Sequence, residues 1–250
     1  MNNLKIIKNI QLIISYRGTH YCGWQIQPNG ITIQEVISGA IYQLTGEKVN
    51  LIGSGRTDAR VHALGQCANF FTSATIPPEQ FFKAINTKLP DDIRILSSKE
   101  CDMNFHSRYN AKGKCYLYKI YEAVVGSPFQ SDLAFQVNQS LDWKAMEEAA
   151  GLFIGEHDFK AFMASGSSVK TTVRRIDSIS FNKKDDLSEI TFIGNGFLYN
   201  MVRIMAGTLF EVGSHRLDPR SISGIILGMD RCKAGITAPA QGLYLKEVFY

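Results

Sequence analysis

The order of hydrophobic periodicities along the first hundred residues is the feature that most constrains the fold. A Thr-x-x-Glu capping box at Thr32 is followed by apolar residues at helical spacing, which predicts a helix to about Thr45. A second helix is predicted after Pro77-Pro78-Glu79, because proline is favoured in the first turn of a helix. Strands are predicted at residues 10–16, 49–53, 65–71 and 93–97. The resulting order is that of a split βαβ, or ferredoxin-like, unit.

The remainder of the chain shows a second copy of this order. Strands are predicted at residues 115–123, 173–181, 187–193 and 243–249, and helices after Asp142, from Phe197 to Val212, and after Asp218-Pro219. We therefore predict an α+β protein with two ferredoxin-like halves, residues 1–105 and 106–250. Each half is expected to be an antiparallel sheet flanked by helices, with the active cleft between the halves.

The loop from Gly53 to Gln66 is the strongest candidate for chemistry. It places Asp58 between Arg56 and Arg60, and it lies between apolar segments rather than in a polar linker. A lone aspartate in a polar turn usually only caps or solvates that turn. Cationic neighbours on both sides, however, fit a carboxylate that is kept ionised for nucleophilic or acid/base chemistry.

Arg203 and Tyr116 are the candidates in the second half. The helix that carries Arg203 is apolar nearly all round, so we expect the guanidinium to be buried and therefore paired, either with a carboxylate such as Glu211, with helix carbonyl groups, or with Asp58. Tyr116 and Tyr118 alternate along a strand and share one face. Each of them is either a core residue or a side chain that contacts a substrate.

Two basic stretches indicate a nucleic-acid partner. The net charge is only +4, but its distribution is uneven. The stretches Asn104–Tyr121 and Phe159–Ile176 each carry several cations and no acidic residue. Aromatic side chains such as Tyr109 are interleaved with them. Cations with interleaved aromatics are typical of surfaces that bind RNA phosphates and bases, although a solvated cationic face has the same composition. The candidate phosphate contacts are Arg108, Lys112, Lys114, Arg174 and Arg175.

Several other classes of function are disfavoured. The five cysteines are scattered and show no metal-ligand spacing, and no phosphate-cradling or dinucleotide-binding glycine motif is present. The amino terminus lacks the apolar region of a signal peptide, and no run reaches the ~18 apolar residues of a membrane span. We expect a soluble, cytoplasmic protein that uses no metal and no cofactor.

The Asp58 loop also carries a family resemblance. Gly55-Arg-Thr-Asp-Ala-Arg-Val-His-Ala63 resembles the signature loop of the TruA-type tRNA pseudouridine synthases, which usually carry glycine at the position of Arg60. Five further motifs resemble that family in order along nearly the whole chain: Phe105–Tyr109, Lys114–Tyr118, Gly155–Phe159, Asn200–Ile204 and Ala238–Tyr244.

The resemblance implies a role for each candidate residue. Asp58 would be the nucleophile, Arg203 its partner, and Tyr116 the ring that stacks on the flipped base. Arg56 would occupy the vacated place in the RNA or hold the phosphate of the flipped nucleotide, while Arg60 and the basic residues would contact RNA. The implied reaction is cofactor-free isomerisation of uridines 38, 39 and 40 in the anticodon arm of tRNA, by a homodimer.

Other classes stay open at this point. A non-catalytic RNA-binding protein would keep the basic stretches and aromatics, and a synthase of this kind could act on another RNA. A nucleoside or glycoside hydrolase would usually need a second carboxylate as general acid, and none is present in the motifs.

Overall fold

The computed structural model describes residues 6–166 and 169–250. The chain separates into two compact units. The N-terminal unit comprises the residues up to Ala111 together with Leu245–Tyr250, and the C-terminal unit comprises Lys112–Tyr244. The last six residues therefore return to the first unit, which sequence order alone does not indicate.

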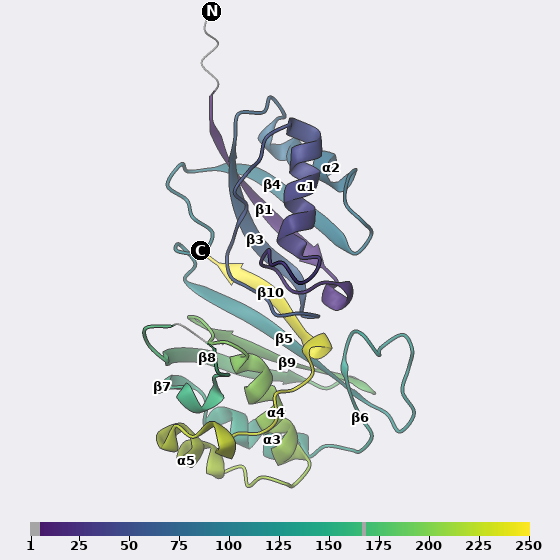
Figure 1. Cartoon of the computed structure of the whole chain (residues 1–250). Helices are drawn as coiled ribbons and strands as arrows, with labels where there is room; N and C mark the ends of the chain where they lie inside the picture. The colour runs from purple at the N-terminus through teal and green to yellow at the C-terminus, as the bar shows by residue number, and fades with distance from the viewer. Residues whose placement is uncertain (1–5, 167–168) are drawn as a thin grey trace, which may run out of the picture. The chain divides into compact units, whose positions relative to one another are not determined.

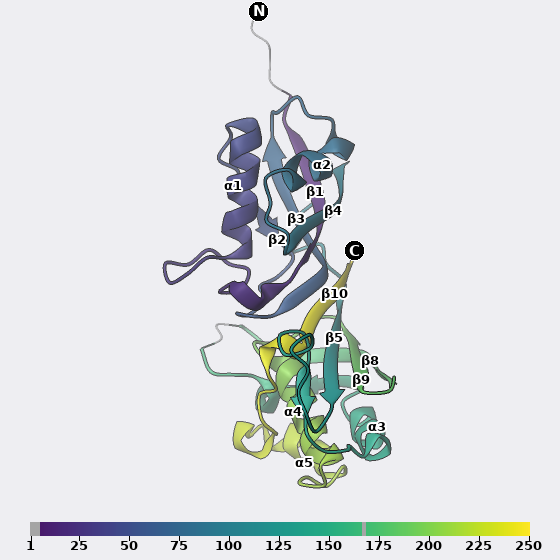
Figure 2. The same ribbon diagram turned by 90° about the vertical axis from the view of Figure 1, so that its right-hand side faces the viewer.

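The N-terminal unit contains an antiparallel sheet in the order β4-β1-β3, with β2 and β10 both beside β3 (Figures 1 and 2). Its strands are β1 (Lys8–Tyr16), β2 (Ile52–Gly53), β3 (His62–Thr72), β4 (Ile93–Cys101) and, from Leu245 onward, β10 (Leu243–Phe249). Because β3 lies next to β1 although β2 precedes it in the chain, the unit has the split βαβ arrangement that the sequence predicts.

Two helices cover one face of this sheet, α1 (Ile33–Thr45) and α2 (Phe81–Asn86) (Figures 1 and 2). Thr32 begins α1 by accepting a hydrogen bond from the backbone N–H of Glu35 at 3.4 Å, and Gly46 ends it with φ 72°. A short 3₁₀ turn, Pro78–Gln80, leads into α2. Five apolar side chains of these two helices are fully buried, and each contributes about 1.5–3 kcal/mol through burial. These residues are Ile33, Ile37, Ile41, Phe81 and Ile85.

The C-terminal unit contains an antiparallel stretch of sheet in the order β5-β9-β8-β7. Its strands are β5 (Gly113–Glu122), β7 (Gly155–Asp158), β8 (Val173–Asn182) and β9 (Leu187–Gly194), and the short β6 (Phe135–Val137) pairs in parallel with β5. Helices α3 (Trp143–Gly151), α4 (Met201–Gly213) and α5 (Ser221–Gly228) lie on one side of it (Figure 1). None of the helices in the described part of the chain is long and apolar enough to cross a membrane.

The predicted α+β class is confirmed, and the differences lie at element ends and in two short strands. α4 begins at Met201 rather than Phe197, because Asn200 has φ 59° and so cannot continue a helix. α5 begins at Ser221, because the Asp218 carboxylate caps a tighter turn by accepting from the backbone N–H of Arg220 at 2.8 Å. The short strands β6 and β7 were not predicted, since three or four residues carry too little periodicity.

Candidate active site

The loop that carries Asp58 connects β2 to β3 and is held from both sides by the segment Tyr21–Gln25. The backbone N–H of Trp24 donates to the Thr57 carbonyl at 3.0 Å, and the backbone N–H of Arg60 donates to the Tyr21 carbonyl at 3.2 Å. These two hydrogen bonds flank Asp58 on its amino and carboxyl sides. The backbone of the aspartate is therefore fixed in position rather than left to a mobile turn.

Gly23 makes this close approach possible. Its φ is 86°, and a Cβ at this position would lie 2.5 Å from the Thr57 carbonyl oxygen. Any other residue would clash with the backbone next to Asp58 and would also strain its own backbone. The sequence shows Gly23 beside two aromatic residues, but only the structure shows that it packs on the Asp58 loop.

Buried polar side chains support the loop from below. The hydroxyl of Tyr16, at the end of β1, is hydrogen-bonded to the Thr57 hydroxyl at 2.7 Å. Gln66, which is fully buried on β3, accepts from the Ser54 hydroxyl at 2.5 Å and donates to the Gly55 carbonyl at 3.0 Å. Burial raises the pKa of Tyr16, so this hydroxyl stays neutral. Sequence reasoning missed this network, although a glutamine within an apolar strand is a signal for it, because buried amides must be paired.

Trp24 and His62 anchor the two ends of the loop. Trp24 is buried, and its ring lies so close to Gly53 that a Cβ there would be 2.6 Å from the indole nitrogen. His62 is buried as well, and its Nδ1 accepts from the backbone N–H of Gly18 at 3.0 Å. Both side chains therefore have structural contacts that explain their burial.

The charged side chains of the loop differ in exposure. Arg56 and Arg60 are exposed, whereas Asp58 is half-buried. Arg60 has φ 67°, in the left-handed region that favours glycine. This geometry gives the physical reason why glycine suits the position at which this chain has arginine.

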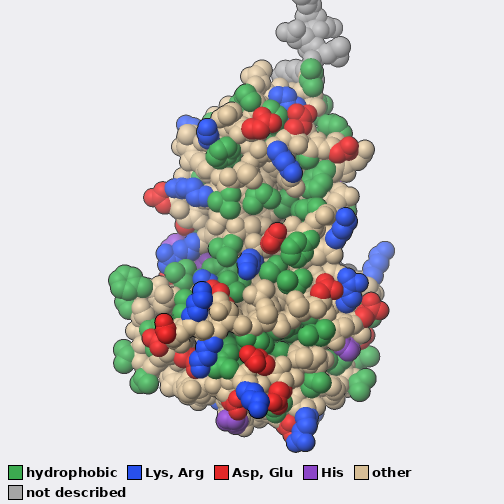
Figure 3. All heavy atoms as spheres, turned by 180° about the vertical axis from the view of Figure 1, so that it is seen from behind, with side chains coloured by type: hydrophobic (Ala, Val, Ile, Leu, Met, Phe, Trp, Pro, Cys, Tyr) green, Lys and Arg blue, Asp and Glu red, His purple; other side chains and the backbone are tan. Residues whose placement is uncertain are grey.

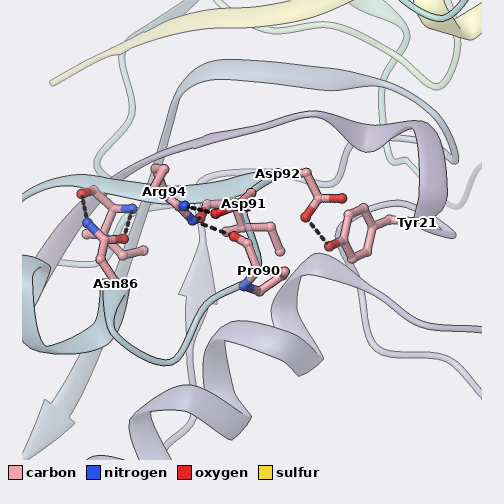
Figure 4. Close-up of polar contacts among 8 residues, drawn as sticks. Tyr21, Asn86, Pro90, Asp91, Asp92 and Arg94 are labelled. Atoms are coloured by element: carbon pink, nitrogen blue, oxygen red, sulfur yellow. Dashed lines mark hydrogen bonds and ion pairs between the residues drawn. The ribbon is translucent and has the colours of Figure 1, made fainter.

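A further contact ties the Tyr21–Gln25 segment to the connection between α2 and β4 (Figure 4). The hydroxyl of Tyr21 donates to Asp92 Oδ1 at 2.6 Å, and the Asp92 carbonyl accepts from the backbone N–H of Arg17 at 2.9 Å. The neighbouring Asp91 forms an ion pair with Arg94 at 2.5 Å. Burial and the Asp92 carboxylate both raise the pKa of Tyr21. Tyr21 thus links Asp92 to the backbone of Arg60, two residues beyond Asp58.

The remaining candidates for the reaction lie in the C-terminal unit. Tyr116, on β5, is only 8% exposed, and its ring meets Phe197 edge to face with centroids 5.1 Å apart. Tyr118, on the same strand, is fully buried and donates from its hydroxyl to the Pro239 carbonyl at 2.9 Å. Tyr118 therefore belongs to the core of this unit.

Arg203 is half-buried on α4 rather than fully enclosed. Its Nε donates to the Ala238 carbonyl at 2.7 Å, and its Nη1 donates to Asn200 Oδ1 at 2.8 Å. Glu211, one of the partners considered from the sequence, forms an ion pair with Arg216 at 2.5 Å. These two hydrogen bonds orient the Arg203 guanidinium through Nε and one terminal nitrogen.

The basic residues differ in their surroundings. Arg108 and Lys112 are exposed and Lys114 is half-buried, whereas Arg175 forms an ion pair with Asp177 at 2.7 Å. Arg174 is half-buried, donates from Nη1 to the Thr171 and Val173 carbonyls, and has a pKa that burial lowers. On the face shown in Figure 3, Lys and Arg side chains are interspersed with Asp and Glu. The Asp177 carboxylate therefore offsets part of the positive charge that the sequence shows around Arg175.

Comparisons with known proteins decide the family. The profile of the family described as tRNA pseudouridine synthase matches residues 12–110 and 149–250. The chain belongs to this family. Its members are isomerases that convert uridine to pseudouridine, as the resemblance of the Asp58 loop led us to expect. The matched residues include Asp58 and Arg203, whereas Tyr116 lies in the stretch between the two matched segments.

Full-length relatives agree with this assignment. The chain is 51% identical to tRNA pseudouridine synthase A of Acetivibrio thermocellus, over 98% of this chain and 100% of the relative. It is 53% identical to tRNA pseudouridine synthase A 2 of Clostridium tetani, over 97% and 99%. Among solved structures, a chain of a Cbf5-Nop10-Gar1 complex aligns with a TM-score of 0.38 and 12% identity over 80% of this chain and 45% of that chain, a likeness too low to support any conclusion.

Proposed function

We propose that the protein converts uridine to pseudouridine in tRNA, at positions 38, 39 and 40 of the anticodon arm, with Asp58 as the nucleophile. Membership of the tRNA pseudouridine synthase family supports the reaction and the class of substrate. The observation that supports Asp58 most directly is the loop that carries it, which backbone hydrogen bonds fix on both sides of this one carboxylate. Catalysis needs such a fixed position, since small displacements of a reacting group are costly.

In the proposed reaction the N1–C1′ glycosidic bond breaks, the uracil rotates, and a C5–C1′ bond forms. Asp58 adds to the ribose C1′ or to uracil C6, or it stabilises a cationic sugar, and it leaves again when the product forms. The proton lost from C5 balances the proton gained at N1, so substrate and product are isomers. No oxidant, reductant or second substrate is needed, and the mechanism uses no metal or cofactor.

The other candidate residues receive supporting roles in this proposal. Arg203 keeps Asp58 ionised by pairing with it, and Tyr116 stacks on the uracil after it has left the RNA helix and assists proton movement at C5. Arg56 fills the place of the flipped nucleotide or holds its phosphate. The residues proposed to contact RNA phosphates are Arg60, Arg108, Lys112, Lys114, Arg174 and Arg175. We also propose that the working unit is a cytoplasmic homodimer.

Asp58→Asn tests the central role. The change removes the carboxylate and keeps its shape, so we expect tRNA binding within about threefold of the unchanged protein and no detectable pseudouridine. Asp91→Asn, which neutralises an exposed carboxylate of the same unit, should keep full activity. Product would be measured with uridine-labelled tRNA and binding by filter retention. Turnover by Asp58→Asn close to that of the unchanged protein would remove Asp58 from the nucleophilic role.

The same labelled tRNA separates the alternative functions. A synthase yields pseudouridine, a non-catalytic RNA-binding protein leaves uridine unchanged, and a hydrolase releases free uracil. Mapping the product to positions 38–40, or to another site or another RNA, then decides the substrate. Sedimentation at several protein concentrations tests the proposed homodimer.

A further inference from the structure

The turn Phe105–Asn110 presents an aromatic platform on the surface of the N-terminal unit. Tyr109 is 77% exposed, which is unusual for a large aromatic side chain. One face of its ring is stacked on the imidazole of His106, with centroids 4.2 Å apart and planes at 27°. The guanidinium of Arg108 lies 5.9 Å from the centre of the same ring. The platform therefore joins a stacked aromatic surface to a cation.

Local hydrogen bonds hold the platform in one conformation. The backbone N–H of His106 donates to Asn110 Oδ1 at 2.7 Å, and the backbone N–H of Asn110 donates to the His106 carbonyl at 3.0 Å. His106 Nδ1 also accepts from the backbone N–H groups of Arg108 and Tyr109, at 3.2 and 3.3 Å. The exposed ring is thus preorganised, which lowers the entropic cost of binding a ligand to it.

Ser107 fastens this turn to the strands around the Asp58 loop. It is fully buried, and its backbone N–H donates to Asn69 Oδ1 on β3 at 2.9 Å. Its hydroxyl donates to the Ile52 carbonyl on β2 at 2.5 Å, and its carbonyl accepts from the Tyr250 hydroxyl at 2.7 Å. Asp58 follows Ile52 by six residues, so the chain between them spans at most roughly 20–22 Å. A few nucleotides of an RNA strand can cover that distance.

We propose that Tyr109 stacks on a base of the RNA substrate close to the target uridine, and that Arg108 contacts the adjacent phosphate. The inference rests on the proposed function and adds a specific contact to it. Base stacking on a tyrosine suits an exposed ring that is held rigidly and backed by a second ring, because every base offers a π-face. Arg108 suits phosphate binding, because its guanidinium carries a permanent charge and is exposed.

Three substitutions of Tyr109 separate base stacking from other effects. We expect Tyr109→Ala and Tyr109→Leu to raise KM for tRNA, and the binding constant measured with Asp58→Asn protein, about 5- to 150-fold, the value of one base stack. Tyr109→Phe should stay within about twofold, since the ring remains. Tyr42→Ala is the matched control: it removes a half-exposed tyrosine of α1 in the same unit and should leave both values unchanged.

Salt dependence tests the role of Arg108 separately. Arg108→Gln should lower the slope of log K against log salt by about 0.7–0.9, the contribution of one phosphate contact, whereas Tyr109→Ala should leave that slope unchanged. Thermal unfolding would confirm that each variant is folded.

Different results would overturn the stacking role of Tyr109 and the proposed function on which it rests. If unchanged protein makes pseudouridine but Tyr109→Ala and Tyr109→Leu bind tRNA normally, the stacking role is wrong while the function stands. If unchanged protein makes no pseudouridine from tRNA, the proposed function fails whatever the variants do. If Tyr109→Ala alters the sedimentation of the protein without RNA and leaves tRNA affinity intact, the platform contacts a second copy of the chain instead.

Discussion

Arg60 has the least favourable backbone conformation in the loop that carries Asp58. The sequence shows that arginine stands at a position where the resembling family usually has glycine, and the structure adds that its φ is 67°. A side chain with a Cβ pays about 1 kcal/mol for this region, which glycine does not. Arginine in place of glycine at position 60 therefore adds a cation to the loop and lowers its local stability.

Arg60→Gly should increase the free energy of unfolding by about 0.5–1 kcal/mol, because it removes the left-handed strain. Urea unfolding followed by circular dichroism would measure the change. Arg56→Gly is the control: Arg56 lies outside the left-handed region, so glycine there should lower stability. If Arg60 also contacts RNA phosphate, Arg60→Gly should weaken tRNA binding while it stabilises the protein. Equal destabilisation by both variants would contradict the strain argument.

Substitutions of Arg203 test the proposal that this residue keeps Asp58 ionised. Arg203→Met removes the charge and keeps most of the apolar stem, so a carboxylate that depends on this cation becomes harder to ionise. Activity should then fall sharply at pH 6 and recover partly towards pH 9, a profile that the unchanged protein should not show. Arg203→Lys should give intermediate activity, because it restores the charge without the planar geometry. Arg216→Met, also on the C-terminal unit, is the control. A pH profile of Arg203→Met that matches the unchanged protein would separate Arg203 from Asp58.

At the scale of elements, the sequence predicts what depends on local periodicity and capping. α1 was predicted to its ends, since the capping box at Thr32 marks its start and the apolar periodicity runs to about Thr45. The strands β8, β9 and β10 were predicted within one residue of their observed bounds. The contacts that hold the Asp58 loop were not predictable, because they join residues 16, 21 and 24 to residues 57 and 60 through the tertiary fold. Periodicity carries no information about such partners.

The hydrogen bond between Tyr21 and Asp92 offers a test of how these elements position Asp58. Tyr21→Phe removes the hydroxyl and leaves the Asp92 carboxylate without this donor, so the free energy of unfolding should fall by about 1–3 kcal/mol. The Tyr21 carbonyl also accepts from the backbone N–H of Arg60. If loss of the hydroxyl shifts Tyr21, the Asp58 loop should shift with it, and kcat should fall several-fold with little change in KM. Asp91→Asn, at the exposed neighbouring carboxylate, should change neither value.

A conservative variant tests whether the hydrogen bond between Tyr21 and residue 92 is what positions the loop. Asp92→Asn keeps an acceptor for the Tyr21 hydroxyl, so its kcat should lie closer to that of the unchanged protein than the kcat of Tyr21→Phe. If Tyr21→Phe lowers stability but leaves kcat and KM unaltered, the contact serves folding only and does not position the Asp58 loop.

At the scale of the whole molecule, each unit has its own buried core, and each core contains a tyrosine whose pKa burial raises. Tyr16 in the N-terminal unit and Tyr118 in the C-terminal unit are 3% and 0% exposed. Burial raises the pKa of both phenols well above the value of about 10 that they have when unfolded. The Tyr16 hydroxyl also has a hydrogen-bond partner, Thr57, in the Asp58 loop, so the same side chain supports this loop.

These two tyrosines predict that the protein loses stability in alkali. Below about pH 10 the phenol is neutral in both the folded and the unfolded state, and its contribution to stability is complete. Above about pH 10 the unfolded phenol releases its proton while the folded phenol keeps it, so each tyrosine lowers the free energy of unfolding by roughly 1.4 kcal/mol per pH unit. Urea unfolding between pH 8 and 11.5 would measure this slope. Tyr16→Phe and Tyr118→Phe should each reduce it by about the share of one tyrosine, whereas Tyr42→Phe, at a half-exposed phenol, should not. A slope that is unchanged in both buried variants would show that these phenols ionise in the folded protein.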